Sequence, residues 1–522
     1  MRRKAGGQRC NANNYPPEAE PEADPTCGNK EPAWMAHPAI EGIEKSSGAS
    51  RKSVNHVTIA RGARRVYVPA MQWKAQEERR LLGQACRKKT GRQQHSELKP
   101  KARSASALVL IERSMRGRVP ALIALKYELM AQSPFGYFRG AAPVMAADLS
   151  VLPTTGIQSQ LCGDAHVRNL GAYAAPDGRL VFDINDFDET IRGPFEWDLK
   201  RMAASLVLAG REAGQKTSTV QQAVVRFIER YCAQMRAFAK MPCVEVGRFL
   251  VHRLGDVEPV HSALLKAQRA TPQFALEQLT EPLGKTTATG KKATRGKTVE
   301  KEAGRRFKEV KPTLTRVTGS QAATVLASLS PYREMLEPQR QHLLSFYRPV
   351  DVAFKVVGTG SVGLRDYCIY FEGNGPGDAL FLQIKEEVAS AYAPYLPNAH
   401  PPKHNGQRTA EGQRAMQMQS DPFLGWTHIG DRQFLVRQLN DHKGSIELED
   451  LKGEGLVAYA EVCGELLARG HGRSGDPVVI AGYLGTGPGF AEALAKFGSA
   501  YADQTEKDWQ DLRRSRRAKS KP

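Results

Sequence analysis

Residues 160–189 read QLCGDAHVRNLGAYAAPDGRLVFDINDFDE, and short β-rich runs in this stretch alternate with polar loops. Aromatic and β-branched residues favour strands, and the Asp177–Gly178 dipeptide is typical of a turn between two strands. One polar loop, GDAHVRN, follows the first strand, and another, NDFDE, follows the last. Because loops at strand ends often carry functional side chains on a rigid scaffold, the stretch predicts β-structure that presents two polar loops.

Carboxylate and amide side chains are concentrated in these two loops. The first contains Asp164 and Asn169, and the second contains Asp186 and Asp188. Mg2+ binds a few carboxylate or amide oxygens together with substrate phosphates, and a carboxylate such as Asp164 can accept the proton of a hydroxyl. For any single Asp, a loop that caps a turn or helix is the better explanation. The whole set favours a catalytic and metal-binding site.

A second motif, GTGSVG at residues 358–363, follows the apolar run DVAFKVV. A glycine turn that binds a dinucleotide should lead directly into a helix, whereas the following LRDYCIYFEG alternates like a strand. A glycine-rich hairpin that covers nucleotide phosphates, followed by a strand with a lysine, fits better. Lys385 lies in such a strand, LFLQIKEE, although an exposed lysine on an edge strand is the alternative. The candidate nucleotide-binding residues are Gly358, Gly360, Gly363, Lys385 and, as the ion-pair partner of the lysine in the next helix, Glu411.

Composition and periodicity divide the rest of the chain. Helical spacing of apolar residues begins near Ala107, and Pro, Gly, Ser, Asn and charged residues dominate before it. The predicted parts are a disordered basic tail at 1–104, a helical region at 105–349 that carries both polar loops and a flexible basic insertion at 283–311, a β-rich nucleotide-binding region at 350–450, C-terminal helices at 451–510 and a basic tail at 511–522.

The net charge of +20 belongs to appendages. Residues 1–104, 283–311 and 511–522 carry +11, +7 and +5, and the remaining residues carry −3. The basic runs lack the interleaved aromatic residues that stack on bases, and the apolar runs are shorter than the roughly 18 residues of a membrane span. We therefore expect neither a specific nucleic-acid partner nor a membrane. Eight scattered cysteines and a start without an apolar leader segment favour a cytoplasmic protein.

Several segments between Ala107 and Lys507 together resemble one known family. They are SPFGYFRGAAPVMAADL, GDAHVRNLG, FDINDFDE, GPFEWDLKRMAAS, VGTGSVGLRDY, QIKE, GQRTAEGQRAMQ and YADQ. The family is the bacterial domain of unknown function 2252, whose members are similar in fold to protein kinases and aminoglycoside phosphotransferases. The resemblance implies an α+β, two-lobed kinase-like fold. Because the glycine motif and Lys385 follow Asp164 by about 200 residues instead of preceding it, that fold would be circularly permuted.

The resemblance also implies roles for individual residues. Asp164 looks like the catalytic-loop Asp that orients or deprotonates the acceptor hydroxyl, and Asn169 looks like an amide ligand of Mg2+. Asp186 best matches the metal-binding Asp, with Asp183 and Asp188 as alternatives. Asp198 resembles the buried Asp that braces the catalytic loop. The implied cofactors are ATP and Mg2+.

The function that the resemblance implies is phosphoryl transfer from ATP to a hydroxyl of a small molecule or protein. A nucleotide-binding regulator without catalysis is one alternative. A metal-dependent phosphoesterase is another, but such sites usually need several His ligands, and only His166 lies near the acidic cluster in sequence. We expect His166 to form hydrogen bonds within its loop. Whether Arg437–Leu439 contacts an adenine base stays open from the sequence alone.

Overall fold

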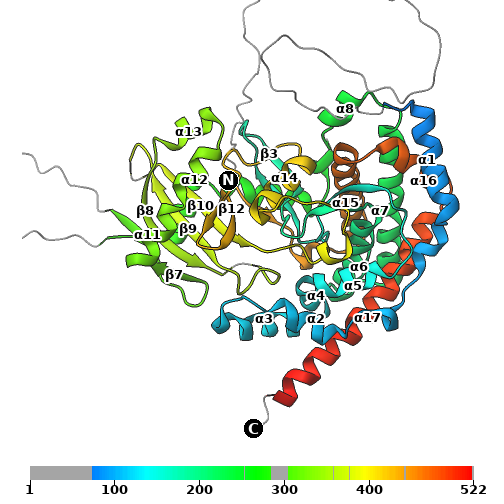
Figure 1. The fold of residues 1–522 in the computed structure, drawn as a ribbon, viewed down its shortest axis with the longest axis horizontal. Coiled ribbons are helices and arrows are strands. Elements are labelled where there is room, and N and C mark those ends of the chain that lie inside the picture. The colour runs from blue at the N-terminus through cyan, green and yellow to red at the C-terminus, as the bar shows by residue number, and fades with distance from the viewer. Residues whose placement is uncertain are drawn as a thin grey trace, which may run out of the picture. The chain divides into compact units, whose positions relative to one another are not determined.

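The computed structural model describes residues 73–251, 253–283, 304–356, 358–375, 377–439 and 442–519. A six-stranded antiparallel sheet lies beside a group of helices (Figure 1). The sheet has the order β11-β12-β10-β9-β8-β7, with β7 (Leu314–Val317), β8 (Arg348–Lys355), β9 (Asp366–Glu372), β10 (Ala379–Glu387), β11 (Gly425–Ile429) and β12 (Arg432–Gln438). The predicted α+β class is confirmed.

The sheet is buried on both faces, and the alternation predicted for its central strand explains how. Tyr367 and Ile369 of β9 pack with helices on one face, whereas Cys368 and Tyr370 belong to a separate apolar cluster on the other. Successive side chains of a strand point to opposite faces, so a run of large apolar residues fills both. The covering helices are α11 (Gly319–Ala327), α12 (Leu329–Met335) and α13 (Pro338–Leu344) on the first face and α10 (Pro272–Leu279) on the second.

The same alternation places the lysine of β10. Leu382 and Ile384 lie in the cluster with α11–α13, so Lys385 and Glu387 point to the opposite face. On that face α14 (Asn405–Met416) packs against β10 and β12. A shift of one residue in the pairing of β10 would turn Lys385 into the apolar cluster, which the burial pattern opposes.

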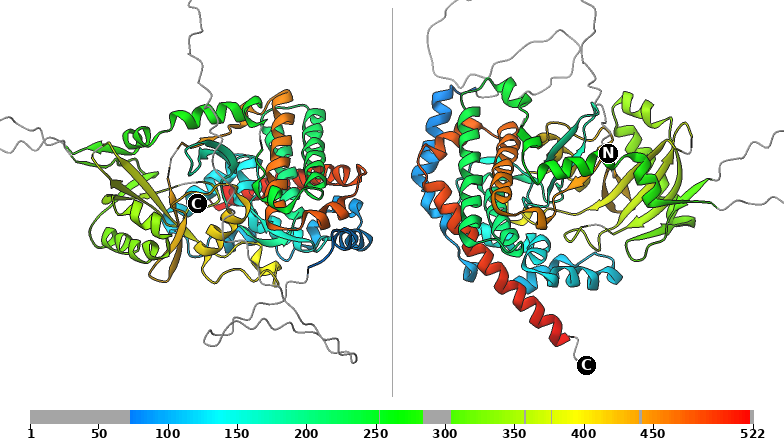
Figure 2. Two further views of the ribbon diagram at one scale, coloured as in Figure 1. Left: turned by 90° about the horizontal axis from the view of Figure 1, so that it is seen from above. Right: turned by 180° about the vertical axis from the view of Figure 1, so that it is seen from behind.

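The helical part is built around α6, which is buried along nearly its whole length, from Glu196 to Gly210. Helices α7, α15 and α17 surround it, as the views from the front, above and behind show (Figures 1 and 2). The helices of this part are α2 (Ala107–Ser114), α3 (Pro120–Gln132), α4 (Pro134–Gly140), α5 (Ala142–Ser150), α6 (Glu196–Glu212), α7 (Thr217–Phe238), α8 (Cys243–Arg248), α9 (Val260–Arg269), α15 (Gly453–Ser474), α16 (Pro477–Leu484) and α17 (Gly489–Lys519).

Two small strand pairings hold the polar loops side by side. The strands are β1 (Gln158–Leu161), β2 (Leu170–Ala174), β3 (Leu180–Ile184), β4 (Ile191–Pro194) and β13 (Gly444–Ser445), which adds to β2. Leu161 pairs with Ile191, and Leu170 pairs with Ile184. The two polar loops therefore begin and end on paired residues, and each loop must run beside the other.

The predicted tail at 1–104 is structured in its last third. Helix α1 (Gln76–Lys89) packs against α16, and a Cβ added at Gly83 would lie 2.0 Å from the carbonyl oxygen of Val479. Arg103 forms a buried ion pair with Asp148 of α5, with Nε 2.7 Å from Oδ1. Composition concealed this helix because its many charged residues lie on exposed faces, while one glycine makes the close contact. Residues 1–72 lie outside the described residues.

Two other predicted boundaries also differ from the structure. The β-rich part begins before residue 350, because β7 and α11–α13 pack with the sheet. The basic segment from residue 511 continues α17 as far as Lys519. The predicted insertion at 283–311 begins directly after β5 (Thr280–Pro282) and contains β6 (Arg305–Phe307), which pairs with β5. Its residues 284–303 lie outside the described residues.

Across the described ranges, no single helix has both the length and the apolar character of a membrane span. Helices α16 and α17, which are bent by 88° at their junction, reach the required length and hydropathy only when they are taken together.

The contact between α1 and α16 can be tested at Gly83. We expect Gly83→Ala to destabilise the protein by roughly 1–3 kcal/mol, because the added methyl group overpacks a backbone-to-backbone contact. Urea unfolding would measure the change. Gly247→Ala is the matched control, since the helical Gly247 has open space around its Cβ position and alanine favours a helix. Equal stability of the two variants would show that α1 does not pack on α16.

Candidate functional site

A cavity of about 710 Å3 lies where the two polar loops meet the glycine-rich segment and the end of β10. It is therefore bounded by segments that are far apart in the sequence. Six of the predicted catalytic, metal-binding and nucleotide-binding residues line this cavity, namely Asp164, Asn169, Asp186, Asp188, Gly358 and Gly360.

The first polar loop is braced by helix α6. Asp198 is buried and accepts hydrogen bonds from the backbone nitrogens of Cys162 and Gly163, at 2.8 and 3.0 Å. This is the bracing contact expected of Asp198. Gly163 has φ +83°, and a Cβ there would lie 2.1 Å from the carbonyl oxygen of Glu189, so only glycine allows the two loops to approach this closely.

Asp164 is held by an arginine from the same helix. Arg201 donates from Nε to Oδ1 of Asp164 at 2.6 Å, and its Nη2 donates to the carbonyl oxygen of Phe138 at 3.1 Å. Burial raises the pKa of the Asp164 carboxyl above its ordinary value, although the Arg201 charge opposes the shift. The aspartate is thus fixed in position, and its raised proton affinity suits a group that accepts a proton.

Asn169 has a defined amide orientation. Its Nδ2 donates to the carbonyl oxygen of Asp164 at 2.8 Å, so the side-chain oxygen is the amide atom left to bind a ligand. Its own carbonyl oxygen accepts from the backbone nitrogen of Asn185 at 2.9 Å, which ties the first loop to the second. His166 is buried, and its Nδ1 accepts from the backbone nitrogen of Arg168 at 3.2 Å, in keeping with the local role expected for it.

The second loop meets Lys385 of β10. The Lys385 Nζ atom lies 2.5 Å from Oδ1 of Asp188 and 3.7 Å from Oδ1 of Asp186. Burial alone would raise the pKa of Asp188, but Lys385 brings that pKa below its ordinary value. Burial and the neighbouring Asp188 charge raise the pKa of Asp186. Two close carboxylates therefore share one lysine, and a further cation would relieve their repulsion.

The residues present fit a magnesium ion. Asp186, Asp188 and Asn169 offer two carboxylates and one amide oxygen along the same cavity. Mg2+ keeps several waters and substrate phosphates and needs only one or two protein carboxylates. Among the described residues, no group of three or more His, Cys, Asp or Glu side chains is arranged to hold a metal ion without such help.

Asp183 is placed away from this group. It is buried and accepts a hydrogen bond from Arg469 of α15, so its carboxylate is already neutralised inside the protein. This arrangement removes it from the candidate metal ligands and leaves Asp186 and Asp188.

The predicted pair between Glu411 and Lys385 is wrong. Glu411 is exposed and accepts a hydrogen bond from Gln407 at 2.7 Å, one turn away on α14. The buried side of α14 includes Thr409, Ala410 and Gln413, and the helical period turns the intervening Glu411 outward. The order of residues in the sequence did not reveal which side of α14 faces the interior of the protein.

The glycine-rich loop is held from the helical side. Gly358 and Gly363 have φ of +59° and +91°, conformations that favour glycine. The buried Lys126 of α3 donates to the carbonyl oxygens of Thr359 and Gly360, at 3.1 and 2.5 Å. The hydroxyl of Ser361 donates to Oδ2 of Asp188 at 2.9 Å. The loop therefore covers the acidic cluster and has a fixed backbone.

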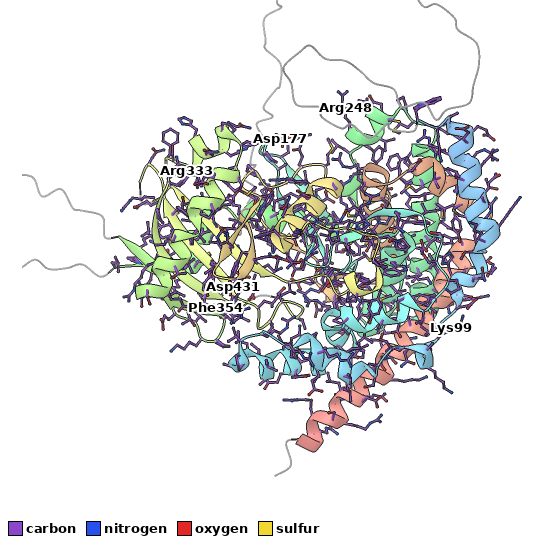
Figure 3. The ribbon with its side chains drawn as sticks, viewed as in Figure 1. Lys99, Asp177, Arg248, Arg333, Phe354 and Asp431 are labelled. Atoms are coloured by element: carbon purple, nitrogen blue, oxygen red, sulfur yellow. The ribbon has the colours of Figure 1, made fainter. Side chains whose placement is uncertain are left out.

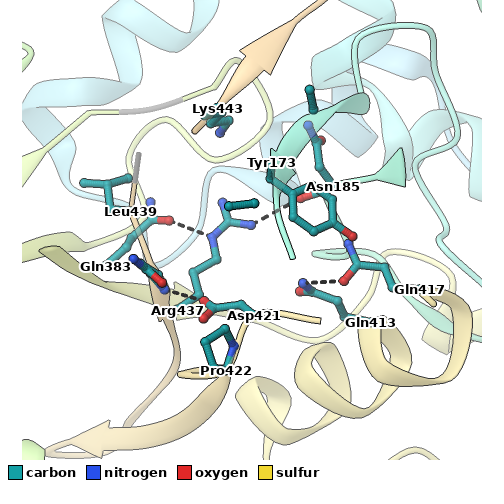
Figure 4. A pocket seen from close by; sticks show the side chains of 13 residues that line it. Tyr173, Asn185, Gln383, Gln413, Gln417, Asp421, Pro422, Arg437, Leu439 and Lys443 are labelled. Atoms are coloured by element: carbon teal, nitrogen blue, oxygen red, sulfur yellow. Dashed lines mark hydrogen bonds between the residues drawn. The ribbon is translucent and has the colours of Figure 1, made fainter. Parts of the chain in front are cut away.

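A second cleft lies next to the first and is rich in side-chain amides (Figure 4). Arg437 crosses it, donating from Nε to Gln383 at 2.8 Å and from Nη1 to the carbonyl oxygen of Asn185 at 3.2 Å. Gln438 and Leu439, part of the segment that the sequence left open as a base contact, also line it. Asn185, which lines this cleft, and Asp186, which lines the first, are neighbours in the second polar loop.

Several residues that shape the site were not singled out in the sequence. Arg201 holds Asp164, Lys126 holds the glycine loop, and Arg408 of α14 donates to the carbonyl oxygens of Asp188 and Thr190, at 2.8 and 2.6 Å. Arg201 had a usable signal in the sequence, because it follows Asp198 by about one helical turn and therefore lies on the same face of α6. Lys126 and Arg408 had no such signal, since their partners are backbone atoms of distant segments.

The buried carboxyl of Asp366, behind Lys385, gives a pH-dependent prediction. Burial raises its pKa to about 7, against the charges of Lys385, Lys355 and Arg437, and it keeps one hydrogen bond, from Gln383 at 2.6 Å. In the unfolded chain its pKa is about 3.9, so folded protein binds the extra proton and stability falls as the pH rises through 7. We compare the free energy of unfolding of Asp366→Asn with that of the wild type at each pH. We expect this difference to shift in favour of the variant by roughly 2–3 kcal/mol between pH 5 and pH 8.

Urea unfolding at the two pH values measures this difference. Asp351→Asn is a suitable control, because Asp351 is paired with Arg316, with 2.9 Å between Oδ2 and Nε. A parallel pH response of wild type and Asp366→Asn would mean that Asp366 ionises normally in the folded protein.

Comparison with known proteins identifies a family and no characterised relative. No curated protein and no solved structure matches the chain significantly. A family model described as an uncharacterized protein conserved in bacteria (DUF2252) matches residues 118–515, which include both polar loops, the glycine-rich loop and Lys385. The chain therefore belongs to this uncharacterized bacterial family, DUF2252.

Proposed function

We propose that this protein is a kinase-like phosphotransferase that uses ATP and Mg2+ to phosphorylate a hydroxyl of a small molecule or protein. One observation carries the proposal. Lys385 and the glycine-rich loop meet Asp188 of the second polar loop, although 197 residues separate the lysine from the aspartate. Asp164 lines the same cavity. Phosphoryl transfer depends mainly on such positioning and charge neutralisation.

The order of elements in the sheet supports a kinase-like nucleotide-binding lobe. Strands β8 and β9 are joined by the glycine-rich loop, β10 carries the lysine, and α14, β11 and β12 follow. In protein kinases a glycine-rich loop covers the phosphates, and the lysine lies on the third strand of the lobe. Here the loops with Asp164 and Asp186 precede the lobe in the chain, which is the order of a circular permutation.

The amide-rich cleft of Figure 4 is the place for the base. Gln383, Gln413 and Gln417 line it, and so does Asn185, the residue before Asp186. A nucleotide with its base in this cleft would direct its phosphates to Lys385 and the glycine-rich loop.

The chain's own residues have distinct tasks in the proposed reaction. Asp164, fixed by Arg201, accepts the proton of the acceptor hydroxyl. The hydroxyl oxygen then bonds to the terminal phosphorus of ATP, the bond from that phosphorus to the bridging oxygen breaks, and ADP leaves. Lys385 binds phosphate oxygens after it separates from Asp188. Mg2+, held by Asn169, Asp186 and Asp188, would supply further charge neutralisation.

One observation favours a nucleotide-binding regulator as the second candidate. In active protein kinases the lysine pairs with a glutamate of the neighbouring helix. Here Lys385 pairs with Asp188 instead, and Glu411 is exposed. The two candidates share the nucleotide site and differ only in turnover.

Asp164→Asn separates binding from chemistry. We expect this variant to bind Mg·ATP as the wild type does and to lose about 10²- to 10⁴-fold in ATP turnover, the usual contribution of a positioned base. Thermal stabilisation by Mg·ATP and release of ADP are the two measurements. Glu411→Gln is the matched control, because it removes an exposed carboxylate of the same chain without touching the cavity.

Nucleotide stabilisation without ADP release in the wild type, across hydroxyl acceptors of varied size, would favour the regulator. Absence of any stabilisation by Mg·ATP would contradict both candidates.

A further inference from the structure

Arg139, near the end of α4, is one of the cations that line the cavity. Among the described residues, its buried Nε has no hydrogen-bond acceptor. Within the described part of the chain, no ion pair involves its guanidinium. Burial lowers the pKa of this guanidinium, and the charges of Arg168, Asp164 and Asp186 also act on it. A buried donor without an acceptor costs free energy, so this group is suited to meeting an anion that comes from outside.

Within the described residues, the ion pairs of the acidic cluster are formed by residues other than Arg139. Asp164 accepts a hydrogen bond from Arg201, with 2.6 Å between Nε and Oδ1, and Asp188 accepts one from Lys385. Arg201 also holds the carbonyl oxygen of Phe138, the residue before Arg139. Arg201 thus ties the backbone next to Arg139 to Asp164. In the part of the chain that the structure describes, the Nε of Arg139 itself has no acceptor.

Two more arginines line the same cavity from α2 and the turn after it. Arg113 and Arg116 are exposed and, among the described residues, form no ion pair. Arg118 differs from them, because its Nη1 donates to the carbonyl oxygen of Val362 at 2.6 Å and so supports the glycine-rich loop. On the α2–α4 side of the cavity, three arginines therefore form no ion pair with any described residue, namely Arg113, Arg116 and Arg139.

We propose that the acceptor is a hydroxyl compound that also carries a phosphate or carboxylate group, and that Arg139, assisted by Arg113 and Arg116, binds this group. The inference rests on the proposed phosphotransferase function. Guanidinium groups bind phosphate and carboxylate through paired N–H donors. We assign the anion to the acceptor because Arg139 lines the cavity together with Asp164, the proposed base, and Arg201 ties the backbone beside Arg139 to that base. Lys385 and the glycine-rich loop are assigned to the nucleotide.

Matched pairs of probes test the anionic group. Full-length protein is saturated with Mg·ADP and then titrated with glycerol 3-phosphate, glycerate or glycerol, and with glucose 6-phosphate or glucose, while thermal unfolding is recorded. We expect further stabilisation by anionic members of the pairs and none by the neutral members. Equal effects of charged and neutral members, or no effect of any anionic member, would overturn the inference.

Variants then locate the binding group. We expect Arg139→Gln to weaken binding of the effective anionic probe at least tenfold, Arg139→Lys to weaken it less, and Arg113→Gln/Arg116→Gln to have an intermediate effect. Stabilisation by Mg·ADP should stay unchanged in each variant, which also reports correct folding. Arg248→Gln and Arg333→Gln are the controls, because these exposed arginines lie outside the cavity (Figure 3).

The outcomes separate the two proposals. Failure of Mg·ADP to stabilise the wild type would contradict the proposed function itself. Intact Mg·ADP binding with unchanged probe affinity in Arg139→Gln would overturn only the role of Arg139. If Arg139→Gln weakened Mg·ATP and left the anionic probe unaffected, the arginine would serve the terminal phosphate of the nucleotide, and the inference about the acceptor would be wrong.

Discussion

The ion pair between Lys385 and Asp188 joins the sheet to the polar loops, and the cavity depends on it. A lysine that is 3% exposed must find an anion, because an isolated buried charge is costly. Its partner comes from a loop 197 residues earlier in the chain. The pairing of β10 in the sheet turns the lysine to the face opposite Ile384, and β3 and β4 hold the loop that carries Asp188. Both scaffolds must be correct for the pair to form.

Contacts to backbone atoms reinforce this junction from three sides. Arg408 of α14 holds the carbonyl oxygens of Asp188 and Thr190, and Lys126 of α3 holds the glycine-rich loop. Asp198 of α6 holds the loop with Asp164 through the backbone nitrogens of Cys162 and Gly163. Each link satisfies a polar group that the close approach of two segments would otherwise bury without a partner. These contacts fix the segments that carry the charged groups of the site. The Nε of Arg139 differs, because among the described residues it has no acceptor.

Prediction from the sequence succeeded where chemistry and spacing are local. Asp164 and Asn169 share one loop, Asp186 and Asp188 share another, and their residue types pointed to one acidic site. The strand alternation of Tyr367 to Phe371 was also visible in the sequence. The partner of Lys385 was not, because the choice between Glu411 and Asp188 depends on the phase of α14 and on contacts between distant segments. Likewise, the charged composition before residue 104 concealed α1, whose packing depends on the small size of Gly83.

The sequence by itself determined the α+β class, the family and the residue types of the two polar loops, the glycine-rich loop and the lysine. These properties follow from local patterns, since strand alternation, turn residues and side-chain types can be recognised without knowledge of neighbours. Tertiary structure alone decided which groups meet. It paired Lys385 with Asp188, buried Asp183 with Arg469 and turned Glu411 to solvent. Within the described ranges it also left the Nε of Arg139 without an acceptor. Long-range pairing depends on register, helical phase and burial, and these are set by the packing of the whole molecule.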